Sequence, residues 1–130
     1  MAGIKYLDKL IRGMTPELVK GEFVFCTVSE SQMRSLQINP LLVFREKEGT
    51  TVILEKEIAD ENALEYAGVW SLITLTVHSD LAAIGFLAKI TAALAEAKIS
   101  VNAVSAYYHD HLFVPVEKAV QAMEVLKKLS

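Results

Sequence analysis

The sequence predicts an α+β protein made of two similar halves, and three observations support this prediction. Short β-forming segments alternate with amphipathic helical segments along the chain. From Glu22 onward, the order strand, helix, strand, strand, helix occurs twice, which indicates an internal duplication. The composition, with 52% hydrophobic and 22% charged residues, is enough to build a buried core. We therefore expect two halves, at residues 1–68 and 69–130.

In the first half, helical spacing of apolar residues predicts a leading helix, and β-forming composition predicts three strands. In chain order we expect an amphipathic helix that ends near Gly13, a capped turn at 15–17 with Pro16, a strand at 22–28, a helical turn or two before Pro40, two strands within 41–57 joined near Gly49, and a short helix that Gly68 ends.

The second half has stronger patterns. Alternation of Ile73, Leu75 and Val77 with more polar neighbours predicts a half-buried strand at 70–78. The remaining elements follow in order: a helix at 81–97, a strand at 100–110 with a tight turn at His109-Asp110, a partner strand that Pro115 ends, and a helix at 117–129 with Val120, Met123 and Leu126 along one side.

Each half is one strand short of a βαββαβ sandwich, because the chain stops after the last helix. The two halves must therefore complete each other, or a second chain must complete them. This reasoning also predicts a homodimer.

Charge and cysteine content exclude several classes of partner. The net charge is −3, and the thirteen Lys and Arg residues are scattered, which predicts binding to neither nucleic acid nor a charged membrane surface. We find neither a signal peptide nor an apolar run long enough to cross a membrane. Cys26 is the only cysteine, so an intrachain disulfide is impossible, and we expect a cytoplasmic protein.

The segment "LITLTVHSDLAAIGFLAKITAALAEAKISVNAVSAYYHDHLFVP" resembles the ACT domain, a small ferredoxin-like βαββαβ regulatory module. The similarity covers residues 72–129 and extends more weakly to the rest. The similarity is strongest to bacterial tandem-ACT proteins of unknown function and to one half of the cytosolic arginine sensor. The resemblance implies a non-catalytic sensor of a free amino acid, without a cofactor, that acts on an unidentified regulated protein.

The step from strand to helix at 78–86 is the predicted ligand site. A helix N-terminus offers unpaired N–H groups to a carboxylate, glycine permits close approach, and the carboxylate of Asp80 suits an ammonium group. Many ACT domains have Asp-x-Pro-Gly here, whereas this chain has four residues between Asp80 and Gly85. By resemblance, further contacts come from a strand across an interface between ACT units. The predicted ligand-binding residues are Ser79, Asp80, Ala83, Ile84, Gly85, Phe86, Val101, Asn102 and Val104.

Other interpretations of these residues stay open. Ser79 or Asp80 can be a simple N-cap, with Gly85 making room for neighbouring backbone. The chain can equally be a structural or oligomerisation module without a ligand. A third hypothesis is a metal-dependent hydrolase built on residues 109–111, although a turn between the two histidines would separate them. We expect Cys26 to be buried and inert, and we identify no catalytic or metal-binding residues.

Overall fold

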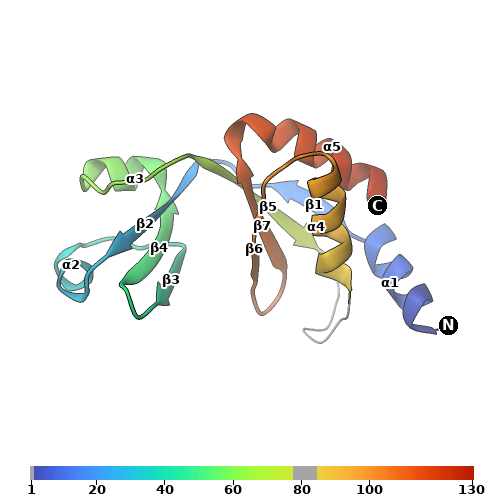
Figure 1. Cartoon of the computed structure of the whole chain (residues 1–130), viewed down its shortest axis with the longest axis horizontal. Helices are drawn as coiled ribbons and strands as arrows, with labels where there is room; N and C mark the ends of the chain where they lie inside the picture. The colour runs from blue at the N-terminus through green and yellow to red at the C-terminus, as the bar shows by residue number, and fades with distance from the viewer. Residues whose placement is uncertain (1, 78–84) are drawn as a thin grey trace. The chain divides into compact units, whose positions relative to one another are not determined.

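The computed structural model describes residues 2–77 and 85–130, with side chains from residue 7 onward. The helices are α1 (Ala2–Arg12), α2 (Glu30–Ser35), α3 (Lys56–Glu61), α4 (Phe86–Glu96), the 3-10 turn η1 (Val116–Lys118) and α5 (Ala119–Leu129). The strands are β1 (Thr15–Leu18), β2 (Phe23–Val28), β3 (Leu42–Arg45), β4 (Thr50–Glu55), β5 (Trp70–Thr76), β6 (Asn102–Ser105) and β7 (Asp110–Pro115). Figure 1 shows these elements along the chain.

The chain forms two compact units, and one is inserted into the sequence of the other. Unit 2 is the continuous segment Gly21–Trp70, whereas unit 1 combines Met1–Lys20 with Ser71–Ser130. The leading helix and β1 therefore pack with the C-terminal elements. The predicted division into an N-terminal half at 1–68 and a C-terminal ACT domain at 69–130 stays a prediction.

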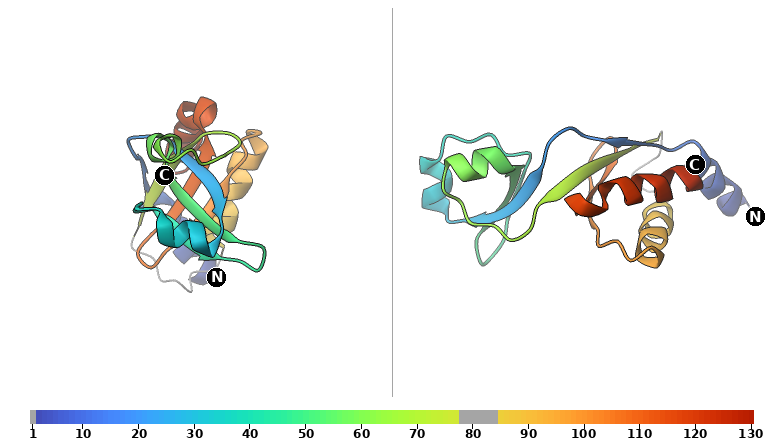
Figure 2. Two further views of the ribbon diagram at one scale, coloured as in Figure 1. Left: turned by 90° about the vertical axis from the view of Figure 1, so that its left-hand side faces the viewer. Right: turned by 90° about the horizontal axis from the view of Figure 1, so that it is seen from above.

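Strand β1 supplies the fourth strand of unit 1. It pairs antiparallel with β5, from Thr15 opposite Thr76 to Leu18 opposite Ile73, and the sheet continues from β5 to β7 and β6. Both views in Figure 2 keep α4 and α5 on one side of these strands. The result is a ferredoxin-like sandwich that the chain completes by itself, one of the two possibilities that the sequence left open.

The core of unit 1 lies between the helices and one face of its sheet. The alternation in β5 is confirmed, because Ile73, Leu75 and Val77 are all in this core. The core also includes Leu10, Ile11, Met14, Phe86, Ile90, Leu94, Ile99, Leu112, Val114, Ala119, Ala122 and Leu126. The N-terminal helix thus contributes directly to the hydrophobic core of the C-terminal elements.

Unit 2 is a smaller sandwich. Strand β2 pairs antiparallel with β4 over six residue pairs, β3 pairs with the other side of β4, and Phe23 pairs with Trp70 at the start of β5. Helix α2 begins at a capping box, in which the side chains and backbones of Ser29 and Gln32 bond reciprocally. Its core comprises Val24, Cys26, Val28, Val52, Leu54 and Ala59. The prediction that Cys26 is buried is confirmed, and burial raises the pKa of its thiol.

Four predictions about elements were wrong. Residues Thr15–Leu18 form a strand, not a turn, and Pro16 is its buried residue. The short helix of unit 2 is Lys56–Glu61, so it ends before Gly68. The last helix begins as a 3-10 turn at Val116–Lys118. On α5, Val120 is 71% exposed, and the buried side includes Ala122 and Leu126.

Candidate functional site

Gly85 ends the connection into α4 and adopts a conformation that requires glycine. Its φ is +85° and its ψ is −9°, which lie in the left-handed region, and it is the N-cap of α4. The predicted helix at 81–97 would include Gly85, whereas α4 begins at Phe86. A β-carbon at this position would lie 3.4 Å from Cδ2 of Leu7, an ordinary van der Waals contact. Backbone conformation therefore explains the glycine better than lack of space.

The N-terminus of α4 presents backbone donors that no side chain among the described residues caps. The first intrahelical bond runs from the N–H of Lys89 to the carbonyl oxygen of Gly85, over 3.0 Å. Gly85 offers no side chain, and the first turn of α4 contains no acidic residue. The N–H groups of Phe86, Leu87 and Ala88 therefore carry the partial positive charge of the helix end, and this position suits an anion.

The predicted residues divide between two ends of unit 1. Phe86 is 2% exposed and belongs to the core, so its backbone N–H, not its ring, is available to a ligand. Asn102 is exposed on β6, and Val101 and Val104 are half-buried. Ser79, Asp80, Ala83 and Ile84 lie outside the described residues.

Within one chain, the structure does not bring Gly85 and the start of β6 together. The tip of the β6–β7 hairpin and the N-terminal end of α4 lie at the same end of unit 1 (Figure 1). Asn102, where β6 begins, is therefore at the opposite end, and α4 itself is about 16 Å long at 1.5 Å per residue. A site that uses both groups needs a strand from another ACT unit, as the resemblance implied.

Strand β6 is the free edge of the sheet in unit 1. Its only strand partner among the described residues is β7, with Asn102 opposite Phe113 and Ser105 opposite Asp110. Edge strands tend to be covered or paired. The edge that carries Asn102 is thus available for contact with a second sheet.

The two histidines near the hairpin follow its tip, His109 at the end of the turn and His111 on β7, and the predicted turn at His109-Asp110 was misplaced. The tip is Tyr107-Tyr108, with the N–H of Ala106 bonded to the carbonyl oxygen of His109 over 3.0 Å. The two tyrosine rings meet edge to face at a centroid distance of 5.0 Å. Both side chains are more than three-quarters exposed.

Polar contacts around the hairpin occupy one of its histidines. Nδ1 of His111 lies 3.0 Å from Oγ1 of Thr74 on β5, and the hydroxyl of Ser105 donates to Asp110 over 2.6 Å. Burial is the main cause that lowers the pKa of His111, and His109 adds to it. Nδ1 of His109 is buried and has no hydrogen-bond partner in the described part of the chain. Among residues 2–77 and 85–130, no three His, Cys, Asp or Glu side chains are placed to hold a metal ion.

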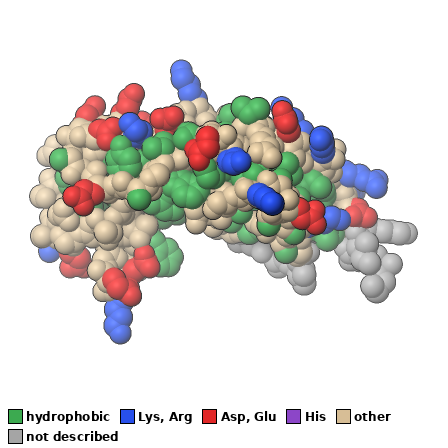
Figure 3. Space-filling view, turned by 45° about the horizontal axis from the view of Figure 1, so that its top comes forward, with side chains coloured by type: hydrophobic (Ala, Val, Ile, Leu, Met, Phe, Trp, Pro, Cys, Tyr) green, Lys and Arg blue, Asp and Glu red, His purple; other side chains and the backbone are tan. Residues whose placement is uncertain are grey.

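Acidic and basic side chains are interspersed on the face that Figure 3 shows. No described helix is both long enough and apolar enough to span a membrane.

Comparison with known proteins decides the family. An ACT domain profile matches residues 2–71, and a second ACT domain profile matches residues 70–128. The chain belongs to the ACT domain family. It contains two ACT domains in tandem, as the sequence predicted, and ACT domains are regulatory modules, not catalytic ones. No curated protein matches the chain in sequence.

Several solved structures share the fold. A Vibrio cholerae protein of unknown function, described as a possible transport protein, is 47% identical, with a TM-score of 0.89 and 98% of each chain covered. An Agrobacterium tumefaciens protein is 14% identical, with a TM-score of 0.72, over 89% of this chain and 88% of that one. The ligand-free regulatory subunit of aspartate kinase from Thermus thermophilus is 9% identical, with a TM-score of 0.68, over 88% of this chain and 95% of that one.

The sequence analysis missed a concave site in unit 2. A pocket of about 470 Å³ is lined by residues of β2, the α2–β3 connection, β4 and α3. None of its lining residues was predicted as ligand-binding. Its residues are far apart in the sequence, and no motif or periodicity marks them.

Proposed function

We propose that the chain is a non-catalytic cytoplasmic sensor, in which a free amino acid binds at the N-terminus of α4 and changes the state of a regulated protein. The carboxylate of the amino acid accepts hydrogen bonds from the N–H groups at the start of α4. The single observation that carries the proposal is the left-handed Gly85, which ends the connection without capping those groups. The family supports this general type of function.

The proposed site needs two copies of the chain. Gly85 lies at one end of unit 1 and Asn102 at the other, so one copy cannot enclose a ligand with both. Two β6 edges that pair about a two-fold axis run antiparallel, which brings opposite ends of the two units together. We therefore propose a homodimer in which Val101, Asn102 and Val104 of one copy complete the site of the other.

Melting the protein with each of the twenty amino acids tests this function. A ligand at 100 times its dissociation constant adds about 2.7 kcal/mol to the free energy of unfolding, so at least one amino acid should raise the melting temperature in a saturable way. Gly85→Asn should abolish the shift, because asparagine tolerates a positive φ but fills the ligand's space. Gly68→Asn is the matched control, since Gly68 also has a positive φ, of +78°, but lies in unit 2.

An assembly module without a ligand is the competing function, and one observation favours it. The edge strand of unit 2 and the residue before it expose large apolar side chains: Leu41 at 55%, Val43 at 43% and Phe44 at 63%. Exposed apolar residues on a strand edge favour association with another sheet. If none of the twenty amino acids shifts the melting temperature at millimolar concentration, while light scattering shows a dimer, this function replaces the sensor.

A further inference from the structure

Unit 2 contains a pocket that is separate from the site at α4. Its volume of about 470 Å³ falls within the usual range for small-molecule sites, roughly 300–1,000 Å³. Six of its lining residues are apolar and three are polar. They are Phe23, Ile38, Pro40, Leu41, Leu54 and Ile58, with Gln37, Asn39 and Glu55.

Backbone hydrogen bonds hold the strand residues of the pocket and Leu41 in place. Phe23 and Glu55 are opposite each other in the β2–β4 ladder, and the N–H of Lys56 donates to Glu22 over 2.9 Å. On the other wall, the N–H of Leu41 donates to Ile53 over 2.7 Å. Phe23 and Leu54 form a floor that is at least 95% buried. The floor and the strand side of the pocket therefore need little ordering when a ligand enters.

One wall offers hydrogen-bonding groups that the described residues leave unused. The N–H of Leu36 donates to Gln32, and the N–H of Leu41 donates to Ile53. Among the described residues, positions 37–40 between them make no backbone hydrogen bond. Gln37 and Asn39 stand in this gap, and neither side chain bonds to any described residue. Their amides and the adjacent N–H groups can therefore donate to a ligand.

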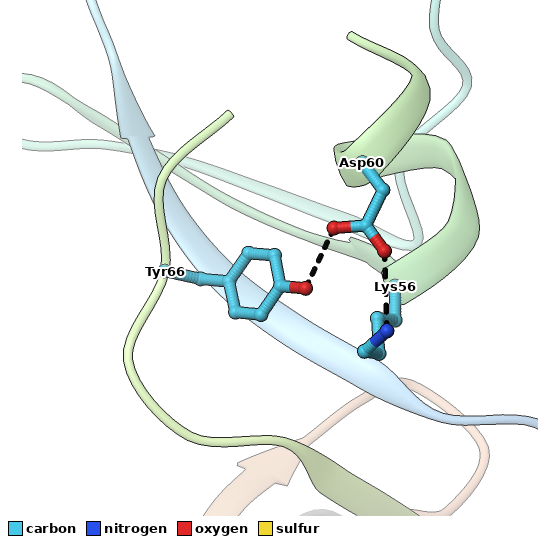
Figure 4. Close-up of polar contacts among 3 residues, drawn as sticks. All are labelled: Lys56, Asp60 and Tyr66. Carbon is cyan, nitrogen blue, oxygen red and sulfur yellow. Dashed lines mark hydrogen bonds and ion pairs between the residues drawn. The ribbon is translucent and has the colours of Figure 1, made fainter. Parts of the chain in front are cut away.

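Among the described residues that line the pocket, Glu55 is the only charged one, and its neighbour Lys56 is paired elsewhere. Nζ of Lys56 pairs with one carboxylate oxygen of Asp60 at 3.1 Å, and the hydroxyl of Tyr66 donates to the other oxygen at 2.6 Å (Figure 4). Among the described residues, the carboxylate of Glu55 has neither an ion pair nor a hydrogen bond. The pocket therefore combines an apolar floor with one unpaired negative charge.

We propose that this pocket binds a small molecule that has a protonated amine and an apolar body. The amine lies against the carboxylate of Glu55, and the apolar body covers Phe23, Leu54 and Ile58. The selecting feature is the cation, because an anion without an amine would meet the negative charge of Glu55. This proposal is independent of the function proposed for α4, since every lining residue belongs to unit 2.

Titrations of the full chain, followed by amide signals in ¹H–¹⁵N NMR spectra, test the proposal. The probes are phenethylamine, L-phenylalanine and 3-phenylpropionate, which share a phenyl group and differ in their charges. Phenethylamine should shift the signals of residues 37–41 and 54–58 in a saturable way, and 3-phenylpropionate should not. If L-phenylalanine binds as well, the source is a free amino acid, and if only phenethylamine binds, it is an amine without a carboxylate. The proposal fails if neither compound with an amine binds there, or if 3-phenylpropionate binds equally well.

Two substitutions on the same surface sharpen this test. Glu55→Gln keeps the shape of an exposed side chain and removes its charge, so phenethylamine should bind at least tenfold more weakly. Glu57→Gln removes the same charge from an exposed residue of α3 that does not line the pocket. The affinity of this variant for phenethylamine should stay within twofold of the wild-type affinity. Equal affinity for Glu55→Gln and the wild type would overturn the proposal, as would equal losses in both variants. Gly85→Asn should leave this binding unchanged, which separates its outcome from that of the α4 site.

Discussion

The N-terminal twenty residues should be essential to the fold of the C-terminal ACT domain, and fragments can test this directly. The fragment 69–130 corresponds to the predicted second half, but it lacks α1 and β1. Without them, the sheet of unit 1 loses the strand that pairs with β5. The same fragment also loses three core side chains, Leu10, Ile11 and Met14, each no more than 5% exposed.

The expected loss is as large as the stability of a small domain. Full burial of one such side chain contributes about 1.5–3 kcal/mol, so the three together contribute about 5–9 kcal/mol. Domains of this size typically unfold with about 5–15 kcal/mol. We therefore expect the fragment 69–130 to be unfolded or aggregated at 25 °C.

A permuted chain provides the matched control. It runs from Ser71 to Ser130, continues through a flexible Gly/Ser linker, and ends with residues 2–20, so that it contains all of unit 1 and lacks unit 2. Circular dichroism melts and NMR spectra should show a cooperative fold for the permuted chain and none for the fragment. A fragment 69–130 that melts cooperatively as a monomer, at a temperature close to that of the permuted chain, would refute the assignment of β1 to unit 1.

Three further outcomes follow from individual residues. Gly85→Ala should destabilise the protein by about 1–2 kcal/mol in thermal melts, and Gly85→Asn by less, because asparagine tolerates the left-handed region better; equal melting temperatures for wild type and Gly85→Ala would contradict the observed φ. The fold lowers the pKa of His111, so as pH falls the unfolded chain binds a proton on this imidazole before the folded chain does. The free energy of unfolding should therefore fall as pH drops below 6.5, and His111→Gln should reduce that fall in denaturant titrations. The thiol of Cys26 is buried and its pKa is raised, so a thiol reagent should label it at the rate of unfolding; rapid labelling of the native protein would show that the site is open.

Local sequence patterns predicted most elements because each pattern reflects interactions between residues that are close in the sequence. The alternation in β5 predicted its buried face, and the polar segment before Pro40 contains the short helix that its capping box begins. Pro16 shows where this reasoning fails. Its backbone lacks an N–H, which favours a turn, yet the segment becomes a strand because it adds to β5, whose residues lie more than fifty positions later. Pairing partners at that separation leave no trace in a local pattern.

The same contrast explains why the site at α4 was only partly predictable. A polar step that leads from an alternating segment into a helical one indicates a strand, a loop and a helix N-terminus, and these are local features. Gly85 was recognised as unusual, but its role depends on a dihedral angle of +85°, which composition does not encode. Its separation from Asn102 follows from the length of α4, so the proposed site takes the two groups from different copies of the chain. The pocket of unit 2 depends even more on residues that are neighbours in space. Glu55 becomes a candidate ligand group only because Asp60, one turn of helix away, holds Lys56. No residue type at position 55 alone would reveal this, since the property belongs to the arrangement of its neighbours.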